Sequence, residues 1–327
     1  MRQNELNKRT SMISVILIPL IVIFAAVDSL FLHREDVSRA QVEHRHVFGA
    51  TYMTMNNPYY KVVDTQLRAI LEQNGDVLLT RDGTMNQERQ NEEIRELIKS
   101  GAEAIFIACV DWDEAEDGIR YARSAGVPVI AIDTEVRNSK LVNCSVVSDN
   151  YQAGVLCAEH LLENRTHADI ILLEHITAIS GRQRIRGFTE TLERHPGFTI
   201  VATGESDGQI ENAMPVMEKL LKEHPEADVV MALNDPSAFG AMAAIEGAGL
   251  SGKFLVYSVD GSPEAKALVA ENMMTATCAQ FPSIMAAEAA RTVYEILSGL
   301  EVDKEIIIPV ELITERNVNR FDISGWQ

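Results

Sequence analysis

The chain has 327 residues, 46% of them apolar and 24% charged, with a formal net charge of −19 at pH 7. This length is sufficient for two lobes with separate cores. The acidic balance excludes the clustered basic surface that nucleic acids and anionic membranes require. Four cysteines lie far apart without a CxxC pair or zinc spacing, and Cys109, Cys144 and Cys278 fall in apolar strand patterns. We therefore expect buried thiols and no disulfide framework.

The N-terminal region combines a basic flank with an apolar run. Three basic residues precede the run from Met12 to Val27, which Asp28 interrupts and residues 29–32 extend. Such a pattern predicts an export signal or a membrane anchor. We favour an uncleaved anchor over residues 12–32, since no clean A-x-A cleavage motif ends the region, and a cleaved signal peptide stays open as the alternative. The polar residues that follow, up to residue 45, read as a tether.

From Val47 onward, apolar strands alternate with amphipathic helices. The first set has strands over 47–53, 76–80, 104–108 and 127–132, and helices over 58–73, 86–100 and 114–124. The second set begins near Ser148, with strands over 169–173, 199–202, 228–233 and 254–259, and helices over 151–163, 182–194, 210–224 and 236–248. Two sequential sets of this kind predict two doubly wound α/β lobes with a cleft between them. A last helix over 283–297 and a strand over 306–308 could complete either lobe on periodicity alone.

The loop Thr54–Tyr60 follows the first strand and opens a helix. Asn57 suits the N-cap and Pro58 the first helical position. Tyr59 and Tyr60 then stand at the carboxyl end of a strand, where open α/β sheets bind ligands. An amide beside two aromatic faces suits a small polyhydroxylated molecule, whereas the plain alternative is a turn with two packing tyrosines.

Further polar residues follow the other strands. Asp133, Asn234, Asp260 and Gln280 each come directly after a strand, and Arg184 lies in a helix that follows another. We expect Asp149 and Asp235, by contrast, to be mainly helix caps. Carboxylates, amides and an arginine together can hydrogen-bond the hydroxyl groups of a neutral sugar, with Arg184 able to form paired bonds.

Two short motifs resemble a hydrolase nucleophile motif and a phosphate-binding loop, and the surrounding sequence disfavours both. Gly204–Gly208 fits G-x-S-x-G around Ser206, yet the only later histidine, His224, lies in a predicted turn. Gly247–Lys253 resembles part of a P-loop, yet it lacks the final Ser or Thr and precedes a strand instead of a helix. We therefore expect no enzymatic activity, no cofactor and no metal site.

Taken together, these motifs resemble the ribose/galactose-type periplasmic sugar-binding proteins, which have the type I solute-binding fold. The resemblance runs from Val47 to about Val318. It rests on the following segments in order: Thr54–Tyr60, Val127–Asp133, Ser148–Asn150, Arg182–Phe188, Leu233–Asp235, Val259–Gly261 and Ala279–Gln280.

The resemblance implies an architecture. Two doubly wound parallel-sheet lobes would be joined by a three-strand hinge, with the chain crossing near Ser148, Gln280 and Pro309, and ligand binding would close the lobes. The implied domains are an anchor and tether at 1–45, a first lobe of 46–148 with 281–310, and a second lobe of 149–280 with 311–327.

The resemblance also implies which residues bind the ligand. At several positions the sequence differs from the family pattern. The ligand-binding residues are expected to be Asn57, Tyr59, Tyr60, Trp112, Asp133, Thr134, Arg184, Asn234, Asp260 and Gln280. Thr134 stands where the ribose pattern has an arginine, Met53 replaces a serine, and no stacking aromatic occurs near Gly208. Trp112 either supplies the missing face or packs at the lobe surface. These departures count against ribose itself and leave a monosaccharide or related polyol.

The leading functional hypothesis is an extracytoplasmic sugar-binding protein that delivers its ligand to an ABC-type permease. It would act in the periplasm or at the outer face of the cell membrane, anchored by residues 12–32. The alternative is a membrane-tethered sugar-sensing subunit that signals to a membrane histidine kinase. A sugar-responsive repressor would need a DNA-binding domain where the apolar segment stands, and a hydrolase based on Ser206 ranks last.

Overall fold

The computed structural model describes residues 45–327. The predicted anchor over residues 12–32, and the tether up to residue 44, lie outside this part of the chain. Among the described residues, no helix combines the length and the apolar character needed to cross a membrane.

The first sheet has six parallel strands in the order β11-β5-β4-β3-β1-β2. Its strands are β1 Val47–Tyr52, β2 Val77–Asp82, β3 Ala104–Ile107, β4 Val129–Ile132, β5 Cys144–Ser148 and β11 Glu305–Ile308. Its helices are α2 Pro58–Gln73, α3 Gln87–Lys99, α4 Glu116–Ser124 and α10 Pro282–Leu297. A short 3₁₀ turn, η1, spans Ser139–Leu141. We call this sheet with its helices the first lobe.

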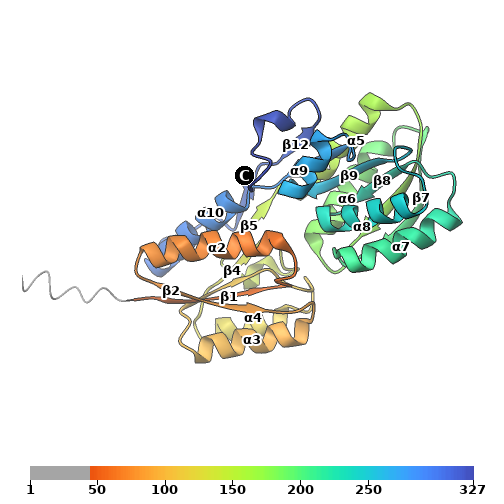
Figure 1. Cartoon of the computed structure of the whole chain (residues 1–327). Coiled ribbons are helices and arrows are strands. Elements are labelled where there is room, and N and C mark those ends of the chain that lie inside the picture. The colour runs from red at the N-terminus through yellow and green to blue at the C-terminus, as the bar shows by residue number, and fades with distance from the viewer. Residues whose placement is uncertain (1–44) are drawn as a thin grey trace, which may run out of the picture. The chain divides into compact units, whose positions relative to one another are not determined.

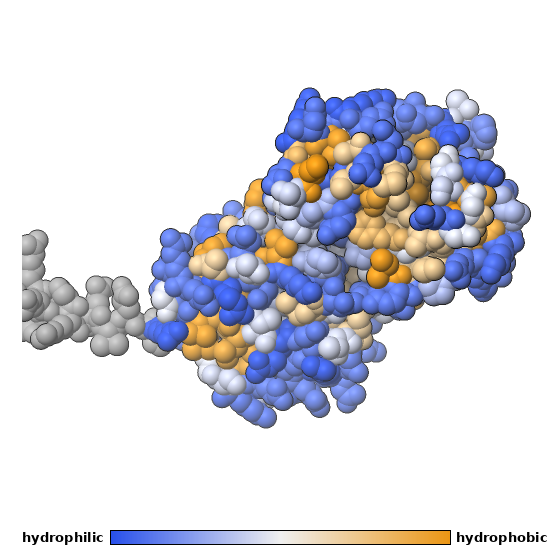
Figure 2. Space-filling view, viewed as in Figure 1, coloured by the Kyte–Doolittle hydropathy of each residue, from blue (hydrophilic) through white to orange (hydrophobic). Residues whose placement is uncertain are grey.

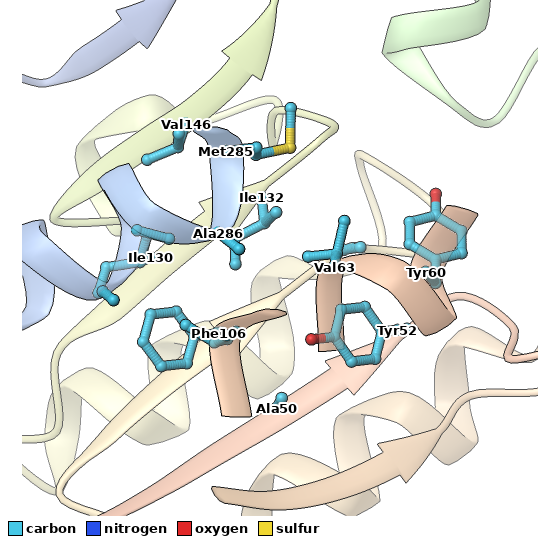
Figure 3. Close-up of a cluster of buried hydrophobic side chains, with 14 of the residues drawn as sticks. Ala50, Tyr52, Tyr60, Val63, Phe106, Ile130, Ile132, Val146, Met285 and Ala286 are labelled. Carbon is cyan, nitrogen blue, oxygen red and sulfur yellow. The ribbon is translucent and has the colours of Figure 1, made fainter. Parts of the chain in front are cut away.

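Helices cover both faces of the first sheet, with α2 and α10 on one face and α3 and α4 on the other (Figure 1). Because side chains alternate along a strand, Phe106 joins the core under α2 and α10 while Ile105 and Ile107 join the core under α3 and α4. Figure 3 shows the first of these cores, with Tyr60 at its margin and the Tyr60 hydroxyl pointing away from the packed side chains. The continuous apolar strands of the sequence are explained by this burial on two faces.

The second sheet has the order β12-β10-β9-β8-β6-β7, and only β12 runs antiparallel to its neighbour. Its strands are β6 Ala168–Glu174, β7 Phe198–Glu205, β8 Val229–Ala232, β9 Leu255–Asp260, β10 Ala276–Ala279 and β12 Glu311–Thr314. Its helices are α5 Asn150–Asn164, α6 Ile179–Leu192, α7 Ile210–Glu223, α8 Asp235–Gly247 and α9 Pro263–Ala270, and a second 3₁₀ turn, η2, spans Val318–Arg320. Helices α5 and α6 cover one face, and α7 to α9 cover the other. We call this sheet with its helices the second lobe.

The chain passes between the two sheets three times. It leaves the first sheet after β5, returns after β10 into α10 and β11, and leaves again from β11 into β12. These crossings fall near Ser148, Gln280 and Pro309. The predicted α/β fold of two doubly wound lobes with a three-strand hinge is confirmed, and the open question of the last helix is answered, since α10 packs on the first sheet and β11 pairs with β5. The residue boundaries predicted for the two lobes stay a prediction.

Candidate functional site

A small cavity, here called the central cavity, lies where the carboxyl ends of both sheets meet. The strand orders 2-1-3-4-5 and 7-6-8-9-10 are equivalent, so each lobe brings its topological switch point to this edge. The predicted residues that line the cavity are Asn57, Tyr59, Tyr60, Asp133, Arg184, Asn234, Asp260 and Gln280. Trp112 and Thr134 are not among its lining residues. The structure thus brings together side chains from segments that are far apart in the sequence.

The loop after β1 positions the first-lobe aromatic residues as the sequence predicts. The Asn57 side chain accepts a hydrogen bond from the Tyr59 backbone N–H at 3.0 Å, and Pro58 occupies the first turn of α2. The rings of Tyr59 and Tyr60 are 5.6 Å apart in an edge arrangement, and both are nearly fully buried. The predicted N-cap at Asn57 is therefore confirmed, and it fixes where both tyrosines enter the cavity.

Two strand-end aspartates occupy backbone conformations that L-residues rarely adopt. Asp133 has a φ of 70° and Asp260 a φ of 145°. Such conformations cost about 1–3 kcal/mol each and persist where the surrounding structure imposes them, most often at functional sites. Both side chains are buried and line the central cavity.

One of the two carboxylate oxygens of Asp133 has no hydrogen-bond partner among the described residues. The Tyr60 hydroxyl donates to Asp133 Oδ2 at 2.9 Å, whereas Asp133 Oδ1 is buried and has no hydrogen-bond partner among residues 45–327. Burial raises the pKa of Asp133, opposed by the nearby Arg184 guanidinium and by the tyrosine hydroxyls. A buried oxygen without a donor is destabilising, so Asp133 Oδ1 can accept from a donor that enters the cavity.

Arg184 is held in the second lobe by two neutral acceptors and the Asp260 carboxylate. Its Nε donates to Asn150 Oδ1 at 2.8 Å and its Nη1 to the Leu233 carbonyl at 3.0 Å, while Nη1 is 3.5 Å from Asp260 Oδ1. Gln280 Nε2 donates to the same Asp260 oxygen at 2.8 Å. Gln280 Oε1 is a second buried acceptor without a partner in the described chain.

Close contact between α5 and α6 sets the position of Arg184. A Cβ atom at Gly154 would lie 1.9 Å from the Arg184 carbonyl oxygen, and one at Gly187 would lie 2.1 Å from the Tyr151 carbonyl oxygen. Only glycine permits this approach. The two glycines therefore bring the α6 backbone that carries Arg184 against α5, which carries its partner Asn150.

Asp235 is a buried residue whose side chain hydrogen-bonds to neighbouring segments, and it is not the helix cap that we expected. Asn234 caps α8 by accepting from Ser237 N at 3.0 Å, whereas Asp235 accepts from the Ser258 hydroxyl, from Thr277 Oγ1 at 2.7 Å and from Ser262 N at 2.8 Å. Burial is the largest cause of the raised pKa of Asp260, and the Asp235 carboxylate adds to it. The other predicted cap is confirmed, since Asp149 accepts from Gln152 N at the start of α5.

Trp112 lies outside the lining of the central cavity and joins the two lobes beside it. Its backbone N–H donates to the Thr177 carbonyl of the second lobe at 3.1 Å. Its ring lies within 5.6 Å of the Arg137 guanidinium from the first lobe and 5.3 Å of the Arg182 guanidinium from the second. Of the two alternatives for Trp112, the structure therefore shows packing between lobe surfaces. Thr134 is fully buried and its hydroxyl has no partner in the described residues.

The prediction overlooked several lining residues, of which His175 is the most informative. His175 is almost fully buried, its Nε2 lies 3.0 Å from Thr177 Oγ1, and burial lowers its pKa. It lies next to Gly208, where we expected no aromatic side chain. His175 directly follows β6, so the rule that located the other strand-end residues could have found it.

The hydrolase reading around Ser206 is not supported by the structure. The Ser206 hydroxyl is buried, lies 2.9 Å from Ser237 Oγ and donates to the Glu174 carbonyl at 3.0 Å. His224 lies at the other end of α7 and pairs with Glu226. Within residues 45–327, no histidine hydrogen-bonds Ser206.

The two lobes contact each other beside the central cavity, which is small. Its volume is about 30 Å³, well below the roughly 300 Å³ at which small-molecule pockets usually begin. Asn56 Nδ2 donates across the lobes to Gln209 Oε1 at 3.3 Å and to Glu211 Oε1 at 3.0 Å. Entry of a monosaccharide therefore requires the lobes to separate, as the hinge permits.

Comparison with known proteins places these features in a family. The periplasmic binding protein domain matches residues 48–301. The ribose import binding protein of Bacillus subtilis is 28% identical over 270 residues, which cover 82% of this chain and 87% of that protein. A D-ribose/D-allose-binding protein of Pseudomonas aeruginosa is 26% identical over 276 residues, covering 80% and 86%. An ABC transporter solute-binding protein of Mycobacterium smegmatis, solved with bound glycerol, superposes with a TM-score of 0.82 at 24% identity, over 86% of this chain and 100% of the other.

Proposed function

The chain belongs to the family of periplasmic binding protein domains, and we propose that it binds a neutral monosaccharide or related polyol in the central cavity between its lobes. The relatives described above are named as binding proteins, and the chain is accordingly a binding protein rather than an enzyme. The relatives' ligands, ribose and allose, suggest the size of molecule to expect.

The observation that carries this proposal is a pair of buried, unpartnered acceptors on two residues that line the cavity, one from each lobe. Asp133 Oδ1 belongs to the first lobe and Gln280 Oε1 to the end of β10 in the second. Sugar hydroxyl groups are donors and acceptors at once, so one molecule can donate to both oxygens. Its remaining lone pairs would accept from Arg184 and the Asn234 amide, which line the same space.

The charges of the cavity favour a neutral ligand. Two carboxyl groups, Asp133 and Asp260, face a single guanidinium, that of Arg184. A ligand carboxylate or phosphate would be repelled by both aspartates when they are ionised. The buried faces of Tyr59 and Tyr60 suit the C–H surface of a sugar ring, which is the complement of its hydroxyl edge.

We further propose the lobe boundaries expected from the sequence, 46–148 with 281–310 and 149–280 with 311–327, and closure of these lobes on the ligand. Delivery of the sugar to an ABC-type permease on the extracytoplasmic side follows from the family's role. The sensory alternative depends on an anchor over residues 12–32, which lie outside the described chain.

A thermal-shift screen of the full-length chain in mild detergent tests this proposal. The panel contains pentoses, hexoses, polyols and furanoses, with ribose and allose included. A ligand that binds only the folded state raises the melting temperature. At 100 times its Kd, such a ligand stabilises the folded state by about 2.7 kcal/mol. Absence of a shift with every sugar, at millimolar concentration, would overturn the proposal.

A further inference from the structure

A second cavity adjoins the central one and is here called the side cavity. Its volume is about 300 Å³, large enough for a small-molecule group. The residues that line it are Asn56, Asn57, Pro58, Gln209, Ile210, Glu211, Pro236, Phe239, Asp260, Ser262, Glu264 and Trp326. They come from both lobes, so the side cavity takes its shape only when the lobes are together.

The side cavity shares part of its wall with the central cavity. Asn57, Gln209 and Asp260 line both spaces. The cross-lobe hydrogen bonds from Asn56 to Gln209 and Glu211 lie in the wall of the side cavity. A group that extends from a sugar in the central cavity past these shared residues would be enclosed by the same contact between the lobes.

The wall of the side cavity is mainly apolar, with aromatic surfaces from Phe239 and Trp326. Figure 2 shows apolar side chains gathered over α7 and α8, the helices that contribute Ile210 and Phe239. The apolar lining contrasts with the hydrogen-bonding lining of the central cavity. The two spaces are thus suited to different parts of one molecule.

Trp326 is fixed in place by its own segment. The buried Lys266 ammonium donates to the Gly325 carbonyl at 2.7 Å and to Gln327 Oε1 at 2.9 Å. Gln327 Nε2 donates to the carbonyls of Gln280 at 2.6 Å and Asp260 at 3.2 Å. The Trp326 ring also meets the Tyr59 ring edge to face at 5.7 Å. The segment that carries Trp326 is therefore bound to the backbone of two central-cavity residues.

We propose that the side cavity is a subsite for an apolar group on the sugar, so that the protein prefers glycosides with an aromatic or other apolar aglycone over the free sugar. This inference rests on the proposed function, because it needs the sugar in the central cavity. The acidic side chains at the side cavity, Glu211, Glu264 and Asp260, disfavour phosphate as the attached group, since no Lys or Arg among residues 45–327 lines it.

The test compares methyl and phenyl glycosides, in both anomers, of whichever monosaccharide gives the largest thermal shift. Calorimetry on the full-length chain gives Kd for each. Enclosure of a phenyl ring against two aromatic walls should make the phenyl glycoside of one anomer bind about tenfold or more tightly than its methyl counterpart. Trp326→Ala and Phe239→Ala should each bring that ratio towards one while the Kd of the methyl glycoside changes less than about threefold. Ile323→Ala is the matched control, because Ile323 is exposed on the same segment and lies outside the side-cavity lining.

The possible outcomes distinguish failure of the subsite from failure of the proposed function. If the monosaccharide binds and neither phenyl glycoside binds more tightly than its methyl counterpart, the subsite is wrong and the proposed function stands. If the phenyl preference persists in both wall variants, the aglycone lies elsewhere and the subsite is again wrong. If no sugar and no glycoside binds, the proposed function fails and the subsite with it. Should Trp326→Ala weaken both glycosides equally by disturbing its segment, the Phe239→Ala ratio decides alone.

Discussion

Replacing Asp133 by asparagine removes a charge from the central cavity with almost no change of shape. Asparagine, like aspartate, tolerates the φ of 70° found at this position. Its amide oxygen can still accept from the Tyr60 hydroxyl, which donates to Asp133 at 2.9 Å. The atom that changes is therefore Oδ1, the buried acceptor without a partner. We expect this variant to keep its fold and to lose affinity for the sugar.

The size of the loss follows from the kind of hydrogen bond that the ligand makes. A bond to a carboxylate contributes about 1.5–3 kcal/mol and a neutral bond about 0.5–1.5 kcal/mol. Losing the difference of about 1–2 kcal/mol raises Kd roughly 5- to 30-fold. The free energy of unfolding of the ligand-free protein should stay within about 1 kcal/mol or rise, because burial raises the pKa of Asp133 and the neutral amide avoids that burial of charge.

Calorimetric titration with the sugar identified by the screen measures Kd, and thermal melts of the ligand-free protein measure stability. Asp133→Ala is the comparison variant, because it also leaves the Tyr60 hydroxyl without its acceptor and disfavours the positive φ. That variant should lose roughly 2–4 kcal/mol of stability as well as affinity. An Asp133→Asn protein that binds the sugar as tightly as the wild type would refute the role given to Oδ1.

Three further predictions test the positioning of the site. Trp112→Ala should raise the ligand dissociation rate about two- to fivefold, because the one arginine–ring contact that crosses the lobes, with Arg182, contributes about 0.5–1 kcal/mol; an unchanged rate in stopped-flow measurements would contradict a closing role. Gly187→Ala places a methyl group 2.1 Å from the Tyr151 carbonyl and should cost about 1–3 kcal/mol by denaturant titration, together with sugar affinity, whereas the control Gly247→Ala, with open space around it at the end of α8, should lower neither. Asp260→Asn should raise the melting temperature of the ligand-free protein more at pH 8 than at pH 4. The raised pKa of Asp260 means that its contribution to stability is present below the unfolded-state value near 3.8 and is lost as pH rises through the folded-state value. A lower melting temperature for Asp260→Asn at both pH values would refute that assignment.

The parts of the fold that sequence predicts well are those determined by neighbouring residues. Helix α2 begins at Pro58 and ends at Gln73, as predicted, because a cap, a proline and Gly75 define its two ends locally. Most strand-end residues were also found, since a parallel sheet brings every carboxyl end to one edge. The antiparallel β12 and the short helix α9 have weak local signals and were not among the predicted elements.

The side chains that sequence could not place depend on packing between distant segments. Asn234 and Asp235 are adjacent and equally able to cap α8, and only the contacts of Asp235 with Ser258 and Thr277 determine which one turns inward. From the sequence, Trp112 could line the pocket or lie at the lobe surface. Its contact with Thr177 of the second lobe is visible only in the folded structure. His175, by contrast, had the same signal as the residues that were found.

The arrangement of the polar groups explains how sugar binding can be coupled to closure. Arg184 is held entirely within the second lobe by Asn150 and Leu233, and Asp133 is held within the first by Tyr60. Each of these groups is therefore held by its own lobe, and in the proposed binding mode a sugar can bond to both Asp133 Oδ1 and Gln280 Oε1 only when the lobes are together. The contacts of Trp112 between the lobes need no sugar, so they raise the fraction of ligand-free protein that is closed. Because the apparent Kd is the intrinsic Kd divided by the binding-competent fraction, the balance between open and closed protein tunes affinity without any change in the cavity.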